Sequence, residues 1–411
     1  MLRSRCLVFL ASLLLVIVCA PYRAGFAQAG PAGNVIKAEA SYEFGEALRF
    51  TLVVQSDQEI TSGNVRFRES TLAAEAVVPL RVSEIEPGIF ELETAIDLKS
   101  LDLRAFSLVH YLFDYTLADG SKVPVKDFAF VYQDDRFDWQ QTGPGPIRIS
   151  WYAGDAAQAG RLQIIAQQSL ASIYNLLRLE APANLDIYIY NSREDLAAAL
   201  PQSGVDWTGS YADADSGLLL AALPAGSEQT LLAQQQLPHE LMHLVLALQA
   251  GSARTPFPAW LEEGLASAVM YFPNADFTSI LDNAVKDGSL LEIPDLCSVL
   301  PSDPKHAALA YAQTASFVQF LLEEYQPDGI RRLVAAYSSG QDCEAGVRTA
   351  LGTSLRELDR RWRREELGEN LVQTTAIRLG PWLLFLAAIL LLPILGMVIA
   401  FRQRRKEEQI Q

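Results

Sequence analysis

Residues 237–246 of this chain read LPHELMHLVL, and residues 258–266 read PAWLEEGLA. His239 and His243 are four positions apart, so on a helix both imidazoles project from one face and can reach one metal ion. Glu240 lies between them, where its carboxylate can take a proton from a water at the ion instead of binding the ion. The spacing therefore predicts a helix that carries two ligands of a zinc site and a general base.

A site of this kind needs a third protein ligand, and the second segment offers Glu262 or Glu263 on a following helix. Either helical face can be buried, so periodicity does not decide between them. Two neutral imidazoles and one carboxylate leave the ion with positive charge, which lowers the pKa of a bound water toward roughly 7. The residues therefore predict one Zn²⁺ per chain. The alternative is a helix with two incidental histidines and a solvated glutamate.

Taken together, His-Glu-x-x-His and Trp-Leu-x-Glu-Gly-Leu-Ala resemble the gluzincin metallopeptidases, in particular the peptidase MA-like family related to thermolysin and the zinc aminopeptidases. The resemblance implies that the glutamate directly before the glycine, Glu263, is the third ligand. The usual spacing after the second histidine in the zinc aminopeptidases selects Glu262 instead, one position earlier. On the motif we expect Glu263.

The resemblance covers about Ile147 to Leu367 and implies an α+β, thermolysin-like catalytic domain with an edge strand beside the cleft. We expect Gly217–Ala222 to be that strand, with which a peptide substrate would pair its backbone. Residues 307–318 resemble the family's downstream Tyr-x-Gln-x-x-Ser-Phe helix. This implies that the Tyr311 hydroxyl donates to the oxyanion of the tetrahedral intermediate. The alternative for Tyr311 is an aromatic residue of helix packing.

Strands and helices alternate ahead of the metal helix, which is expected over Gln234–Ala250. Pro238 either opens that helix or kinks one that starts near Ser227. Gly264 is expected to let the two ligand-bearing helices approach closely. The other expected elements are a strand at 147–152, a helix at 156–177, a strand at 185–190, a helix at 193–200 capped by Ser192, and a last soluble helix through Trp362 capped by Thr353 or Ser354.

Residues 35–134 have a period of two, with turn residues between short apolar runs. The clearest pair is 109–117 and 123–131, joined across Asp119-Gly120, a dipeptide typical of hairpin turns. Several short strands within about a hundred residues favour an immunoglobulin-like or fibronectin-like β-sandwich. We expect a spacer or recognition module here, followed by a linker over 135–146 and the catalytic domain over 147–370.

Both ends of the chain predict a membrane topology. Residues 1–29 carry early arginines, an apolar run and a small-residue cleavage site, which is typical of a secretory signal peptide. Residues 381–401 are apolar and long enough for a single transmembrane helix, and the basic segment 402–411 follows as a cytoplasmic tail. We therefore expect a single-pass protein of the cell membrane with its catalytic domain outside the cytoplasm.

The formal net charge of −16 argues against nucleic acid as a partner, since no basic patch stands out to neutralise phosphates. Cys297 and Cys343 remain once the signal peptide is removed, and in an oxidising compartment a disulfide between them is a hypothesis. The alternative is two unpaired thiols.

We interpret the chain as a membrane-anchored zinc metallopeptidase that acts on a peptide or protein substrate, with His239, His243 and Glu263 as ligands, Glu240 as general base and Tyr311 as oxyanion donor. One alternative is a non-catalytic surface protein with a structural or empty metal site. Another keeps the zinc chemistry but acts on a non-peptide amide.

Overall fold

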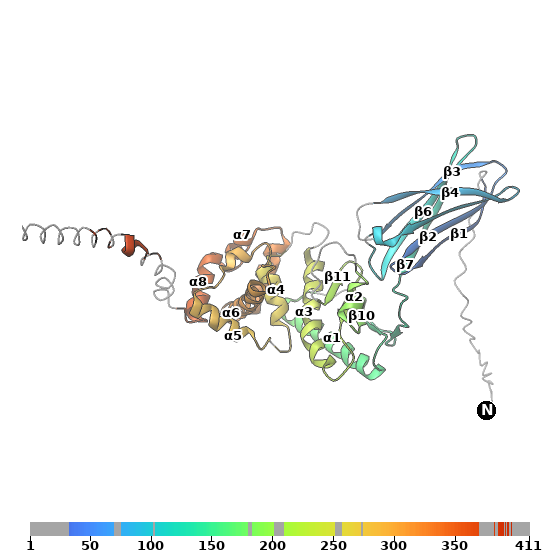
Figure 1. Cartoon of the computed structure of the whole chain (residues 1–411). Helices are drawn as coiled ribbons and strands as arrows, with labels where there is room; N and C mark the ends of the chain where they lie inside the picture. Colours follow the sequence, from blue (N-terminus) through green and yellow to red (C-terminus); the bar gives the residue numbers. More distant parts are fainter. Residues whose placement is uncertain are drawn as a thin grey trace, which may run out of the picture.

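The computed structural model describes residues 33–69, 75–101, 103–179, 183–200, 209–250, 257–272 and 274–369, together with 382, 385–389, 391, 393 and 396. The expected signal peptide (1–29), the tail (402–411) and most of the expected membrane span (381–401) lie outside these residues. Within the part of the chain described, no helix combines the length and apolar character needed to cross a bilayer. A β-rich domain, a second sheet with its helices and a helical region follow one another along the molecule (Figure 1).

The N-terminal domain is all-β, as the sequence predicts. Its strands run in the order β1-β2-β5-β4-β3-β6-β7, with every neighbouring pair antiparallel. The groups β1-β2-β5-β4 and β3-β6-β7 have the strand order of an immunoglobulin-type sandwich. Residues 76–80 of β4 pair with β3 and residues 81–86 pair with β5, so one barrel-like sheet replaces two separate ones. The strands are β1 (Asn34–Glu43), β2 (Ala47–Gln55), β3 (Ile60–Glu69), β4 (Ala76–Glu86), β5 (Ile89–Asp97), β6 (Ser107–Leu117) and β7 (Lys122–Tyr132).

The β6–β7 hairpin shows how alternating apolar residues and a tight turn form this domain. Alternate residues of β6 are buried, among them Tyr111, Phe113 and Tyr115. Gly120 has a φ of 86°, a left-handed value that glycine adopts without steric cost, and the Leu117 N–H donates to the Ser121 carbonyl at 2.9 Å. The turn thus fixes a register that places one aromatic face on the core.

The second sheet has the order β11-β12-β10-β9-β8. Its three central strands are parallel, and both outer strands are antiparallel to their neighbours. The five strands are β8 (Gln140–Gln141), β9 (Ile147–Trp151), β10 (Leu185–Tyr190), β11 (Ser210–Asp213) and β12 (Leu218–Ala222).

Two sequence-based expectations need correction at this sheet. The expected edge strand, Gly217–Ala222, is the inner strand β12, and the edge is β11. A continuous apolar run is typical of a strand buried on both faces, and every residue of β12 is buried, whereas an edge strand alternates. The segment 135–146 is also more than a linker, because β8 lies within it and pairs with β9.

α1 and α3 pack on one face of this sheet, α2 packs on the other, and further helices continue beyond it. Buried residues of α1 and α3 share one core with Ile187, Ile189 and Leu219 of the sheet. Asp155 caps α1, Ser192 caps α2 and Ser354 caps α8, each by accepting a backbone N–H. The helices are α1 (Ala156–Leu177), α2 (Arg193–Ala197), α3 (Gln229–Ala250), α4 (Ala259–Ala268), α5 (Phe277–Asp287), α6 (Pro304–Ser338), α7 (Cys343–Leu351) and α8 (Leu355–Glu365), with 3₁₀ turns at Leu98–Ser100 and Ile293–Leu296.

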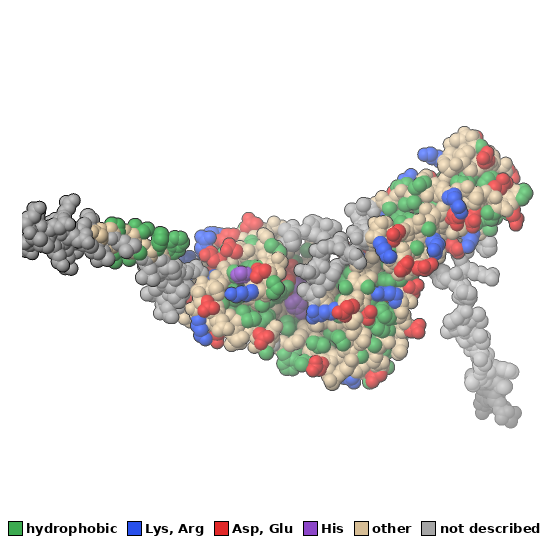
Figure 2. All heavy atoms as spheres, in the orientation of Figure 1, with side chains coloured by type: hydrophobic (Ala, Val, Ile, Leu, Met, Phe, Trp, Pro, Cys, Tyr) green, Lys and Arg blue, Asp and Glu red, His purple; other side chains and the backbone are tan. Residues whose placement is uncertain are grey.

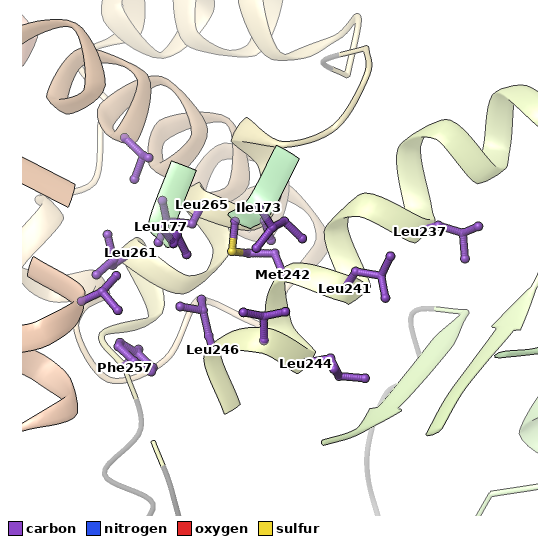
Figure 3. Close-up of a cluster of buried hydrophobic side chains, with 14 of the residues drawn as sticks. Ile173, Leu177, Leu237, Leu241, Met242, Leu244, Leu246, Phe257, Leu261 and Leu265 are labelled. Atoms are coloured by element: carbon purple, nitrogen blue, oxygen red, sulfur yellow. The ribbon is translucent and has the colours of Figure 1, made fainter. Parts of the chain in front are cut away.

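The apolar side of α3 lies in this core. Figure 3 shows Met242 and Leu246 of α3 among Ile173 of α1 and Leu261 and Leu265 of α4. All five side chains are buried. Each fully buried aliphatic side chain contributes about 1.5–3 kcal/mol to folding, so the histidines of α3 project from a helix that is held firmly on its opposite side.

Pro238 lies inside α3, which begins at Gln229, so the helix starts before the proline and the proline does not open it. Proline has no N–H and leaves the carbonyl four residues earlier without its helical donor. That carbonyl belongs to Gln234, and it accepts the Tyr271 N–H at 3.2 Å. The proline thus creates the acceptor that ties the segment after α4 to the metal helix.

Gly264 makes a close approach, but to a different helix from the one expected. A Cβ at this position would lie 2.3 Å from Val318 Cγ2 and 2.6 Å from the Thr314 carbonyl oxygen, both on α6. The glycine therefore lets α4 lie against α6, and α6 in turn sets the position of α4 relative to α3. Sequence spacing alone could not identify the partner helix.

We expect Gly264→Ala to lower the free energy of unfolding by about 1–3 kcal/mol, because a backbone carbonyl cannot move aside as a flexible side chain can. Zinc affinity should fall as well, since Glu263 is the adjacent residue. Gly160→Ala is the matched control: Gly160 lies in α1 with open space around its Cβ position, and alanine there should stabilise by about 0.5–1 kcal/mol. Denaturant melts and zinc titrations of both variants test this, and an unaltered Gly264→Ala protein would contradict it.

Cys297 and Cys343 are joined by a disulfide in the structure. The Cys297 carbonyl accepts the Ala259 N–H at 2.9 Å, and the Trp260 indole N–H donates to Cys343 Sγ at 3.4 Å. The bridge therefore holds the first turn of α4, the helix that carries both candidate glutamate ligands.

Candidate metal centre

The structure brings three ligand atoms from two helices to one point. Oε2 of Glu263 lies 3.5 Å from Nε2 of His239 and 3.6 Å from Nε2 of His243, and the two nitrogens are 3.2 Å apart. Among the described residues, these three form the group of histidine, cysteine and acidic side chains that could hold a metal ion. The side chains are 20–21% exposed, so one side of the group stays open to solvent.

These separations fit zinc. Ligand atoms about 2.0–2.2 Å from an ion at tetrahedral angles lie roughly 3.3–3.6 Å apart. In addition, Oε2 of Glu263 is buried and makes no hydrogen bond within the described structure. A buried carboxylate oxygen without a donor is unfavourable, and a cation at this point would satisfy it. The residues present therefore fit a zinc ion with one coordination position left for water.

Glu262 takes a different position from Glu263. Its Oε1 lies 3.1 Å from Nδ1 of His243, on the opposite side of the ring from the ligand group. A ligating histidine commonly donates its second N–H to a carboxylate, which fixes the tautomer and orients the ring. The geometry therefore places Glu263 in the group that could hold a metal ion, and Glu262 beside the outer nitrogen of His243. Sequence reasoning treated Glu262 only as a rival ligand.

Burial and the neighbouring charges act in opposite directions on the pKa values of His243 and Glu263. Burial and the charge of His243 lower the pKa of His239. Burial also lowers the pKa of His243, but its hydrogen bond to Glu262 and the nearby charges of Glu263 and Glu240 outweigh burial and raise it. The pKa of Glu263 lies below its usual value, because the two histidines outweigh the effect of burial. Glu263 is thus held as a carboxylate, the form that binds a cation.

Glu240 and Tyr311 lie close to this group. Glu240 follows His239 on α3, and its charge acts on the pKa of both histidines. Burial raises the pKa of Tyr311 to about 12, with further contributions from the charges of Glu263 and Glu240. The Tyr311 hydroxyl therefore stays protonated near neutral pH and can donate a hydrogen bond.

Other residues singled out from the sequence lie elsewhere or have structural contacts. His306 is an exposed residue in the first turn of α6, with Nδ1 2.8 Å from Asp303, as expected of a surface position. In the tyrosine motif, the Gln313 side chain is buried and bonds both backbone groups of Leu291. Ser316 accepts the Trp362 indole N–H at 3.1 Å. Gln313 and Ser316 therefore have packing contacts within the helical region.

The space-filling view places histidine atoms in a recess near the middle of the molecule, with acidic side chains beside them (Figure 2). The ligand residues come from α3, below the second sheet, and α4, at the start of the helical region. The site therefore lies where these two parts meet, which is a common place for an active site.

Residues 165–367 match the family model described as the Peptidase MA superfamily. All three candidate ligands, Glu240 and Tyr311 lie within this range. No curated protein sequence matches the chain. The family match supports a metallopeptidase-like protein of this superfamily.

Several solved structures show weak similarity. An aminopeptidase N family protein from Idiomarina loihiensis has 8% identity and a TM-score of 0.33 over 77% of this chain and 68% of its own. Wild-type OgpA from Akkermansia muciniphila has 19% identity and a TM-score of 0.21 over 26% of this chain and 30% of its own. A bromine derivative of BhCBM56 has 16% identity and a TM-score of 0.18 over 26% of this chain and 99% of its own. Scores this low carry no argument about fold or function.

Proposed function

We propose that this chain, with its Peptidase MA region over 165–367, is a zinc-dependent peptidase. The observation that carries the proposal is the convergence of His239, His243 and the unsatisfied carboxylate oxygen of Glu263 at tetrahedral spacing. A zinc ion held there would act as a Lewis acid and lower the pKa of a bound water to about 7. An orienting carboxylate and a protonated tyrosine beside such a group suit hydrolysis of an amide bond.

Residues of the chain would carry out proton transfer, stabilise the oxyanion and orient His243. Glu240, next to a ligand but outside the ligand group, would accept a proton from the attacking water and pass it to the leaving amine. Tyr311 would donate its hydroxyl proton in a hydrogen bond to the carbonyl oxygen as negative charge develops there. Glu262 would keep His243 in the tautomer that presents Nε2 to the ion.

The peptide would be held by the edge strand. β11 is the outer strand of its sheet and packs against α3, the helix that carries the histidines. An extended peptide can add to such an edge through backbone hydrogen bonds, which positions a scissile bond without requiring a particular side chain. Among the described strands of this sheet, we assign substrate pairing to β11 and not to β12.

We further propose that the enzyme is anchored in the cell membrane by 381–401, with its catalytic domain outside the cytoplasm. The sequence features at both ends support this topology, and the Cys297–Cys343 disulfide suits an oxidising compartment. Protease accessibility of the catalytic domain in intact cells tests it, and protection of that domain would contradict it.

The test of the function uses the full-length protein purified in detergent. We expect about one zinc per chain and hydrolysis of peptides from a mixed library, abolished by a chelator and restored by added zinc. Zinc-loaded protein that cleaves no peptide would favour the non-catalytic alternative. Zinc-dependent cleavage of non-peptide amides alone would favour the other alternative, a zinc hydrolase whose substrate is not a peptide.

Tyr311→Phe should lower kcat by about 10²–10³-fold, because it removes a donor to the developing oxyanion. Zinc content and KM should change little, since the hydroxyl is assigned no part in metal or ground-state binding. Tyr325→Phe, on the same helix but distant from the ligand group along it, is the control and should keep full activity. Equal activity of the wild-type protein and Tyr311→Phe would leave Tyr311 as a packing residue only.

A further inference from the structure

The N-terminal domain packs against the face of the second sheet that α1 and α3 leave uncovered. Tyr188, Tyr190 and Leu220 of that face share a core with Ala105 and Phe106 of the N-terminal domain. Figure 1 shows the N-terminal domain next to the part of the molecule that carries β10, β11 and α2. The domain is therefore not a detached spacer.

Three consecutive residues before β6 make this contact, each in a different way. The Ala105 N–H donates to the Ala199 carbonyl at 3.0 Å. The Phe106 ring stacks on Tyr188 with centroids 3.5 Å apart, and Phe106 has a φ of 64°, which is uncommon for a residue with a side chain. A strained backbone of this kind persists only where surrounding contacts hold it, so the docked arrangement is strongly specified.

Arg104 connects the N-terminal domain to the edge strand. Its guanidinium pairs with the fully buried carboxylate of Glu69, with NH2 2.7 Å from Oε1. On its other side, NH1 lies 3.8 Å from Oδ2 of Asp213, and the guanidinium carbon lies 5.3 Å from the centre of the Tyr211 ring. Tyr211 and Asp213 are alternate residues of β11, so both side chains project from the same face of that strand.

We propose that Arg104 is a positioning residue for substrate: it fixes β11 from the N-terminal domain so that this outer strand stays aligned beside the metal helix. The inference rests on the proposed function, in which β11 pairs with an extended peptide. β11 is only four residues long and has one neighbour among the strands that the structure describes, so its position depends strongly on contacts outside the sheet. The side chains of Arg104 and Asp213 are 16% and 8% exposed, which limits the screening of their attraction by solvent.

The test compares Arg104→Gln with Arg136→Gln in the full-length protein. Arg136 lies at the same domain junction, where it pairs with Asp134 and donates to the Asp195 carbonyl at 3.0 Å, but within the described structure it makes no polar contact with β11. We expect Arg104→Gln to raise KM for a peptide substrate about tenfold, the effect of roughly 1.4 kcal/mol, with kcat within about twofold. Backbone amides of Ser210–Asp213 should exchange about tenfold faster with solvent. Arg136→Gln should leave both quantities unchanged.

Unchanged KM and unchanged exchange at Ser210–Asp213 in Arg104→Gln would overturn the proposal. Equal increases in KM for both variants would also overturn it, because a general loosening of the domain junction would then explain the result. A wild-type protein without chelator-sensitive hydrolysis would refute the proposed function itself. The exchange measurement would then still decide whether Arg104 fixes β11.

Discussion

Glu240→Gln is expected to abolish peptide hydrolysis while the protein keeps its zinc. The substitution preserves size but replaces the carboxylate by a neutral amide, which cannot act as a general base. A positioned general base contributes about 10²–10⁴-fold to rate, so kcat should fall by that factor. The ligand group of His239, His243 and Glu263 does not include Glu240, so zinc content should stay at about one per chain.

The measurement pairs kcat with metal analysis on the same preparation. Glu228→Gln is a control, because Glu228 is exposed and lies directly before α3. It should match the wild-type protein in both quantities. Loss of zinc in Glu240→Gln would move Glu240 into the ligand group, and unchanged hydrolysis would remove it from the mechanism.

The second prediction with a large effect concerns the zinc affinity of variants at the neighbouring residues Glu262 and Glu263. Glu263→Gln should weaken zinc binding far more than Glu262→Gln, although the two changes are chemically identical. Glu263 places an unsatisfied carboxylate oxygen between the two Nε2 atoms, whereas Glu262 contacts the far nitrogen of His243. Loss of an outer partner of a ligating histidine costs about 10–100-fold in metal affinity, and loss of a direct ligand should exceed this.

Competition with a chromogenic chelator gives both affinities, and the two variants serve as controls for each other. Equal losses would contradict the division of roles. A larger loss for Glu262→Gln would reverse the assignment and return Glu262 to the ligand position.

Local sequence spacing was enough to predict that His239 and His243 lie side by side, as they do in the structure. His239, Glu240 and His243 belong to one helix, and helical geometry alone places the two rings on one face. Local spacing could not decide whether Glu262 or Glu263 lies in the ligand group. They differ by about 100° around α4, and the rotation of α4 relative to α3 is set by contacts with α6 at Gly264. The motif pointed to Glu263, and the geometry places that residue in the ligand group.

In the fold, too, local sequence predicts some features, whereas others depend on contacts between residues far apart in the chain. The hairpin of β6 and β7 follows from alternation and one Asp-Gly turn, both of which are local. The identity of the edge strand does not follow from local sequence. β11 is short, and it is an edge strand only because of the strand order of the whole sheet. The contact of Arg104 with Asp213 joins residues of different domains, and no periodic pattern marks either of them.

The most direct test of the metal centre is a crystal structure of the zinc-loaded protein with anomalous data at the zinc edge. We expect one anomalous peak about 2.0–2.2 Å from Nε2 of His239, Nε2 of His243 and a carboxylate oxygen of Glu263, with water at the fourth position. A peak bound through Glu262, or no peak between the two histidines in a protein shown to contain zinc, would contradict the account.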